Sequence, residues 1–191
     1  IEIINSKRFS NKVELLAILF WGIYFKVMAR SPKSIASVVE FIQSDSFKNK
    51  MNKRKNAIIN SSNPKSLFKK FDGHLKVPGL GYAYFTKLFF FYRQALVPEG
   101  QTFLILDKWL SNAWCAIEGS KNSNTEVFDR FYKAKTDHWF DGTLKRKKPE
   151  AYKSYLDFMD SLRNGLSEES EHEISLIDLE EKLFGSDLKQ N

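Results

Sequence analysis

Apolar residues recur at intervals of three and four along most of this chain, which is the spacing of one face of a helix. Phe85, Leu88, Phe89 and Tyr92 give a clear example of such a stripe. Only nine Gly and five Pro interrupt the 191 residues, which is few for an all-β chain of this length. The pattern therefore predicts helices over residues 10–29, 32–47, 51–59, 66–71, 82–96, 124–136, 146–164 and 174–185, with a further helix starting near Asp107.

A short glycine-containing loop, Pro78-Gly79-Leu80-Gly81, separates two of these helices. Helix-breaking residues bound these two helices on both sides. The preceding helix ends at Asn60-Ser61-Ser62-Asn63-Pro64, and the second helix of the pair ends at Pro98-Glu99-Gly100. We therefore expect a helix–hairpin–helix motif at residues 64–96.

The length of the chain suits one helical domain over residues 1–191, or two small lobes that share an interface. An apolar fraction of 42%, with 17 Phe, is enough for a sizeable core. Residues 166–191 are rich in Glu, and we expect them to form an acidic C-terminal segment.

The net charge of +7 is unevenly distributed along the chain. Residues 1–100 hold 17 Lys and Arg against 6 Asp and Glu, whereas residues 166–191 hold 2 against 8. A polyanion is therefore expected to meet the N-terminal half, and the acidic segment to be repelled or to fold onto basic surface. An excess of Lys and Arg over Asp and Glu is, however, also found in proteins that never bind nucleic acid.

Several classes of protein are excluded by what the sequence lacks. Cys115 is the only cysteine, which rules out an intramolecular disulfide, an iron–sulfur cluster and any multi-cysteine metal site. The three histidines have no metal-ligand spacing, and Gly79-Leu80-Gly81 lacks the third glycine of a dinucleotide loop, so we expect no metal and no cofactor. Residues 13–25 are apolar but too short to span a bilayer. The sequence thus favours a cytoplasmic, nucleoid-associated monomer without membrane or protein partners.

The glycine loop has the features of a site that holds a phosphate. Glycine permits positive φ and close approach of the backbone, and this loop leads directly into the N-terminus of a helix, which attracts anions. Such a loop grips the DNA backbone without reading bases. The same four residues also suit an ordinary turn between two helices.

Lys87 lies six residues after Gly81, in a run that is otherwise almost wholly apolar. Apolar surroundings disfavour the charged ammonium, so the pKa of this lysine is expected to fall. A free amine of lowered pKa is what a Schiff-base nucleophile requires. The alternative is a surface lysine whose aliphatic stem covers apolar neighbours.

Asp107 follows the apolar run Phe103-Leu104-Ile105-Leu106 and is placed to cap the next helix. A carboxylate at this point can also stabilise positive charge that develops at an anomeric carbon as a base leaves its sugar. The two roles are compatible.

Residues 79–88, Gly-Leu-Gly-Tyr-Ala-Tyr-Phe-Thr-Lys-Leu, followed by Leu104-Ile105-Leu106-Asp107, resemble the bacterial 8-oxoguanine DNA glycosylase OGG-like proteins of the helix–hairpin–helix superfamily. The resemblance covers residues 77–115 most closely. It implies an all-α, helix–hairpin–helix DNA glycosylase-type fold with the active site in a cleft between two small helical lobes. Many relatives place the lysine two residues after the last hairpin glycine, where this chain has Ala83. The later position of Lys87 implies the compact branch of the superfamily.

The resemblance implies excision of a damaged or modified base from duplex DNA, with 8-oxoguanine as the expected target. Lys87 would attack C1′ and Asp107 would assist, and the resulting imine can proceed to cleavage of the strand. The base must first be flipped out of the duplex. The expected contacts to the DNA backbone are Gly79, Leu80, Gly81, Lys70, Lys76 and Arg93, with Lys65 and Lys69 beside them, and the aromatic candidates for the base pocket are Trp21, Tyr24, Trp109, His138 and Trp139.

Two other functions stay open at this point. A monofunctional glycosylase that acts on a bulky modified base of foreign DNA, such as phage DNA, would use Asp107 to activate water, and would suit a role in antiviral defence. A non-catalytic helix–hairpin–helix module would use Lys87 only as a phosphate contact.

Overall fold

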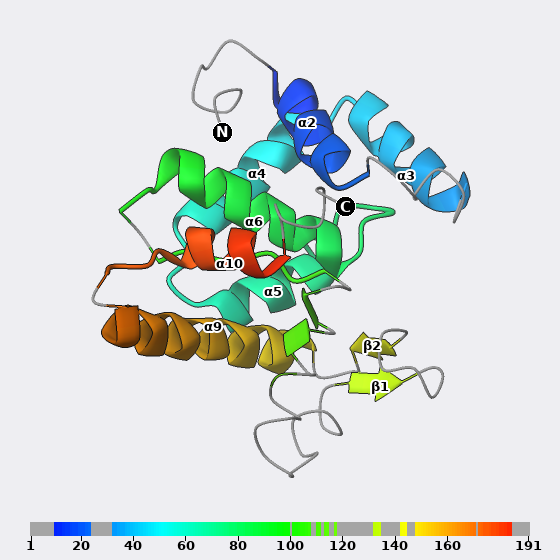
Figure 1. Cartoon of the computed structure of the whole chain (residues 1–191). Helices are drawn as coiled ribbons and strands as arrows, with labels where there is room; N and C mark the ends of the chain where they lie inside the picture. The colour runs from blue at the N-terminus through cyan, green and yellow to red at the C-terminus, as the bar shows by residue number, and fades with distance from the viewer. Residues whose placement is uncertain are drawn as a thin grey trace. The chain divides into compact units, whose positions relative to one another are not determined.

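The computed structural model describes residues 10–23, 32–99, 101–107, 110–111, 113–114, 117, 132–134, 142–144, 148–170 and 172–184. Its elements are α2 (Asn11–Ile23), α3 (Pro32–Gln43), α4 (Phe47–Ile59), α5 (Pro64–Asp72), α6 (Tyr82–Leu96), β1 (Tyr132–Ala134), β2 (Gly142–Leu144), α9 (Lys148–Ser170) and α10 (Leu176–Phe184) (Figure 1). Helices dominate the described residues, so the predicted all-α fold class is confirmed.

Two helix predictions were wrong in detail. The helix expected over residues 32–47 ends at Gln43, because a turn at Ser44–Ser46 follows, in which the Ser44 hydroxyl donates a hydrogen bond to the Phe41 carbonyl at 2.8 Å. Within the helix expected over residues 124–136, the described residues 132–134 form strand β1 instead. This strand pairs antiparallel with β2, with Tyr132 opposite Leu144. Such pairing depends on a partner strand further along the chain, which helical spacing does not reveal.

The chain divides into two compact units, Ile1–Ile105 and Leu106–Asn191. In the first unit α6 is the central helix and packs against α2, α4 and α5. The interface between α5 and α6 is aromatic: Phe68 meets Phe85 edge to face at 4.7 Å, and Phe71 meets Phe89 at 4.8 Å. The two helices that flank the glycine loop are therefore fixed against each other by buried rings. A single domain with an active-site cleft stays a prediction.

A buried ion pair links three helices of the first unit. Glu14 of α2 is almost fully buried, and its carboxylate lies 2.8 Å from the ammonium of Lys55 on α4. The Tyr92 hydroxyl of α6 donates to the same carboxylate at 3.3 Å. Burial and the neighbouring carboxylate raise the pKa of Tyr92 far above its usual value. These contacts explain why an apolar helix carries one glutamate.

The second unit contains the long helix α9, which packs against α10. Tyr155 of α9 is fully buried and meets the Trp114 ring at 5.9 Å. Burial raises the pKa of the Tyr155 hydroxyl well above its usual value. Among the helices that the structure describes, none has both the length and the apolar character needed to cross a membrane.

Candidate functional site

The glycine loop begins with a turn that the sequence specifies closely. The Leu80 amide donates to the Val77 carbonyl at 3.1 Å, which closes a four-residue turn. Pro78 stands at its second position and Gly79, with φ of 77°, at its third, as a type II turn requires. The Leu80 side chain is buried and anchors the turn, so Leu80 can offer only its backbone to the expected DNA contact.

Gly81 has a different reason to be a glycine. It is the N-cap of α6, with φ of −87° and ψ of −179°, a conformation that any residue adopts. A Cβ atom built at this position meets nothing within 4 Å. The fold therefore does not require glycine here, and what glycine provides is a bare backbone at the N-terminus of a helix. A bare backbone at a helix N-terminus is compatible with the close approach of an anion.

Arg54 of α4 fixes the segment that enters this loop. Its side chain is buried, and its guanidinium donates to the carbonyls of Leu75 at 2.8 Å, Lys76 at 2.7 Å and Lys50 at 2.9 Å. It also lies over the Phe41 ring, 5.0 Å from its centroid. Because burial disfavours the charged form, the pKa of Arg54 is lowered. Arg54 thus links α4 to the backbone of the two residues that directly precede the turn, Leu75 and Lys76.

Arg93 differs from the expectation that it contacts phosphate. Its side chain is only 4% exposed, and its guanidinium donates to the carbonyls of Gln101 at 2.8 Å, Ser61 at 2.7 Å and Ile58 at 3.1 Å. It also stacks on Phe103 at 4.3 Å. Arg93 therefore ties the C-terminal half of α6 to the segments around it and is not a surface cation. The lysines Lys69, Lys70 and Lys76 are exposed.

Lys87 lies on the more accessible face of α6 and yet is itself buried. Its side chain is 6% exposed, whereas Ala83, Tyr84, Phe91 and Gln94, which share this face by helical spacing, are all half-buried. The ammonium lies 5.7 Å from the centroid of the Tyr84 ring. Because a helix rises about 1.5 Å per residue, the lysine stands about 9 Å along the axis from Gly81. The structure thus buries this amine beside an aromatic ring.

Asp107 caps the helix that follows it, as its position in the sequence predicted. One carboxylate oxygen accepts a hydrogen bond from the Leu110 amide at 3.0 Å, and the Asp107 carbonyl accepts one from the Ser111 hydroxyl at 2.6 Å. The Asp107 side chain is half-buried. Lys87 belongs to the first unit and Asp107 to the second.

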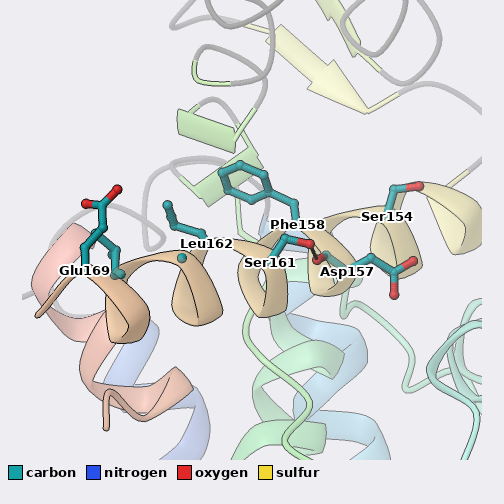
Figure 2. Close-up of a pocket in the computed structure, with 8 residues that line it drawn as sticks. Ser154, Asp157, Phe158, Ser161, Leu162 and Glu169 are labelled. Atoms are coloured by element: carbon teal, nitrogen blue, oxygen red, sulfur yellow. Dashed lines mark hydrogen bonds between the residues drawn. The ribbon is translucent and has the colours of Figure 1, made fainter. Parts of the chain in front are cut away.

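The expected base pocket cannot be placed among the described residues. Tyr24, Trp109, His138 and Trp139 lie outside them, and of Trp21 only the helical backbone is described. A hollow of 430 Å³ does lie along α9, lined by Ser154, Asp157, Phe158, Ser161, Leu162, Gly165, Leu166 and Glu169 (Figure 2). Its open form on one helix face, without Lys87 or Asp107, does not suit a pocket that encloses a base.

No cluster of His, Cys, Asp or Glu within the described ranges is suited to hold a metal ion. The role of Arg54 was missed from the sequence, although helical spacing contains the signal. Phe47, Met51, Arg54 and Ile58 form one buried stripe of α4, and an arginine within such a stripe must find backbone partners.

Comparison with known proteins places this chain in a family. The model of the family described as "Putative 8-oxoguanine DNA glycosylase OGG-like protein" matches residues 12–184, which is nearly the whole chain. Neither the curated proteins nor the solved structures gave a match.

Proposed function

This chain belongs to the 8-oxoguanine DNA glycosylase OGG-like family, and from that premise we propose that it excises a damaged or modified base from duplex DNA, with Lys87 as the nucleophile. The observation that carries the proposal is the placement of Lys87. Its side chain is only 6% exposed, and it lies on α6, the helix that begins directly after the glycine loop. A lysine that served only as a phosphate contact would need an exposed ammonium.

The proposed chemistry follows from the amine. The nitrogen of Lys87 attacks C1′, the bond between C1′ and the base breaks, and the base leaves with its bonding electrons and takes up a proton. Opening of the sugar ring then gives an imine between the lysine and C1′. Loss of a proton from C2′ expels the 3′ phosphate by β-elimination and nicks the strand.

Asp107 is assigned the electrostatic part of this reaction. Its carboxylate stabilises the positive charge that builds up on the sugar as the base departs. One carboxylate oxygen already holds the Leu110 amide, which orients the group and leaves the second oxygen for the sugar. The proposal requires Lys87 and Asp107 to act on the same nucleotide.

The test uses end-labelled duplexes that contain 8-oxoguanine, uracil, an abasic site or glucosylated hydroxymethylcytosine, each incubated with and without borohydride. We expect a trapped covalent adduct that requires Lys87, is absent with Lys87→Gln, and forms on the duplex whose base is the natural target. The Asp107→Asn variant should form the adduct more slowly on the same duplex.

Other outcomes identify other functions. Release of the base without trapping, retained in Lys87→Gln, would support a monofunctional glycosylase in which Asp107 activates water. Binding of all duplexes without release or nicking would overturn the proposal in favour of a non-catalytic DNA-binding module.

A further inference from the structure

The basic run at residues 48–55 lies on α4, outside the glycine loop, and the proposed base excision gives it no role. One stripe of this helix is buried, and it is made of Phe47, Met51, Arg54 and Ile58. The rest of the helix surface falls into two flanks on either side of that stripe, because successive residues turn by about 100°. Each flank carries lysines, and the two have different surroundings.

Contacts with α2 occupy the first flank. The Asn11 amide donates to the Asn52 side chain at 2.9 Å, and Lys55 forms its ion pair with Glu14 at 2.8 Å. The positive charge on this side of α4 is thus partly neutralised within the fold. Lys55 stabilises the packing of α4 against α2 through its ion pair with Glu14.

Lys50 and Lys53 form the opposite flank, and both side chains are exposed. Arg54 connects this flank to the glycine loop, because one guanidinium donates to the Lys50 carbonyl at 2.9 Å and to the Lys76 carbonyl at 2.7 Å. The backbones of Lys50 and Lys76 are therefore neighbours, although 26 positions separate them in sequence. Lys76 is exposed as well. We call these three exposed lysines, which the Arg54 contacts bring into one region of the first unit, the α4 basic strip.

Positive charge predominates around this strip. Residues 45–99 contain eleven Lys and Arg against three acidic residues, Asp45, Asp72 and Glu99. Within the described part of the chain, none of the three lysines of the strip forms a salt bridge. A surface that serves only solubility intersperses both signs, whereas an uninterrupted positive strip complements a polyanion.

We propose that the α4 basic strip, Lys50, Lys53 and Lys76, binds phosphates of the DNA duplex beyond those held at the glycine loop. This inference rests on the proposed action on DNA and adds a second region of backbone contact to it. Because phosphate contacts carry no base information, the strip sets the register of the duplex on the protein and leaves the choice of base unchanged.

The test is the salt dependence of binding to an undamaged duplex, measured by fluorescence anisotropy between 50 and 200 mM salt. Each phosphate contact contributes about −0.9 to the slope of log K against log salt. We therefore expect the Lys50→Gln/Lys53→Gln variant to reduce the magnitude of the slope by about 1.8, with affinity at 0.1 M salt lowered roughly tenfold or more. The Lys50→Arg/Lys53→Arg variant keeps both charges and should retain the slope.

A control matched in net charge is available on α9. Lys153 pairs with Asp157 at 2.6 Å and Arg163 with Asp160 at 3.3 Å, so Lys153→Gln/Arg163→Gln removes two positive charges that are already paired locally. We expect this variant to keep the slope of the unmodified protein. Equal loss of slope in both double variants would show an effect of net charge alone and would overturn the inference.

The remaining outcomes separate this inference from the proposed function. An unchanged slope in Lys50→Gln/Lys53→Gln, with tight binding by the unmodified protein, overturns the α4 basic strip and leaves base excision standing. A reduced slope, with no base released from any modified duplex, supports the strip and overturns excision. Failure of the unmodified protein to bind DNA overturns both. Thermal melting checks that the exposed substitutions leave the fold intact.

Discussion

Gly79 and Gly81 stand two positions apart, yet the backbone requires a glycine only at the first. Gly79 has φ of 77°, which disfavours any side chain, whereas the cap position at Gly81 leaves open space for one. The fold therefore does not require glycine at position 81, and the proposed phosphate contact supplies a reason for it there. Stability and DNA binding should respond differently to substitution at the two positions.

We predict that Gly81→Ser keeps or slightly raises stability while it weakens DNA binding. Serine is a good N-cap, worth a few tenths of a kcal/mol over glycine, but its side chain fills the space that a phosphate would enter. The loss of one backbone hydrogen bond to a charged phosphate, about 1.5 kcal/mol, should lower affinity about tenfold. Urea unfolding and anisotropy measure the two effects. Gly79→Ala is the comparison, and it should lose about 1–2 kcal/mol because of its positive φ.

Asp107 combines a structural and a proposed chemical role in one side chain, and substitution can separate them. Asparagine caps a helix about as well as aspartate, so Asp107→Asn should keep the bond to the Leu110 amide and change stability by less than about 0.5 kcal/mol. Removal of the charge should slow base excision by about 10²–10³. Asp107→Ala should lose both activity and about 1 kcal/mol. Equal activity of Asp107→Asn and the unmodified protein would remove this residue from the mechanism.

At the scale of helices and loops, two buried arginines perform the same task in different places. Arg54 donates to carbonyls at the entry to the glycine loop, and Arg93 donates to carbonyls around residues 58–61 and 101. Both stack on a phenylalanine and both are about 95% buried. They therefore form a natural matched pair, in which only one arginine positions the proposed DNA contact.

Replacement of each arginine by lysine tests this division. A lysine cannot reach all three carbonyls, so both variants should lose roughly 2–3 kcal/mol of stability. Only Arg54→Lys should also weaken DNA binding and raise KM, with kcat little changed, because the loop is then less well positioned for the ground state and the transition state alike. The assays belong at a temperature where both variants are folded. Equal KM values in the two variants would reduce Arg54 to a purely structural residue.

For the whole molecule, alkaline pH should be destabilising in both units. Tyr92 lies in the first unit and Tyr155 in the second, and the pKa of each is raised by burial. The folded chain then keeps both hydroxyls neutral at a pH where the unfolded chain ionises them. The stabilisation from each neutral hydroxyl is therefore fully present below about pH 10, which is the pKa of tyrosine in the unfolded chain. Above that pH, the free energy of unfolding falls by about 1.4 kcal/mol per pH unit for each tyrosine.

Two phenylalanine substitutions distinguish the contributions. The Tyr155 hydroxyl has no hydrogen-bond partner within the described residues, so Tyr155→Phe should leave stability at pH 8 unchanged or higher. Tyr92→Phe loses the bond to Glu14 and should cost about 1 kcal/mol at pH 8. Each variant should show a smaller loss of stability above pH 10 than the unmodified protein. Urea unfolding at several pH values measures these differences.

The sequence predicted the local features of this molecule well and the non-local ones poorly. The second helix of the motif runs from Tyr82 to Leu96 as expected, because its apolar spacing and its flanking breakers lie within the segment itself. The residues adjacent in sequence likewise predicted the cap at Asp107 and the burial of Lys87. The strand at Tyr132–Ala134 and the buried, structural positions of Arg54 and Arg93 were not, because they depend on partners in other segments.

The contrast between buried Lys87 and the exposed lysines of the glycine loop and α4 has a consequence for chemical modification. An acylating reagent reaches amines in order of their accessibility, so mild acetylation would remove the positive charge of Lys50, Lys53 and Lys76 before it reached Lys87. A preparation treated in this way should lose affinity for DNA while it keeps the amine that is proposed to react. Acetylation, whether by a reagent or in a cell, would thus regulate how often the protein meets its substrate without altering what it does there.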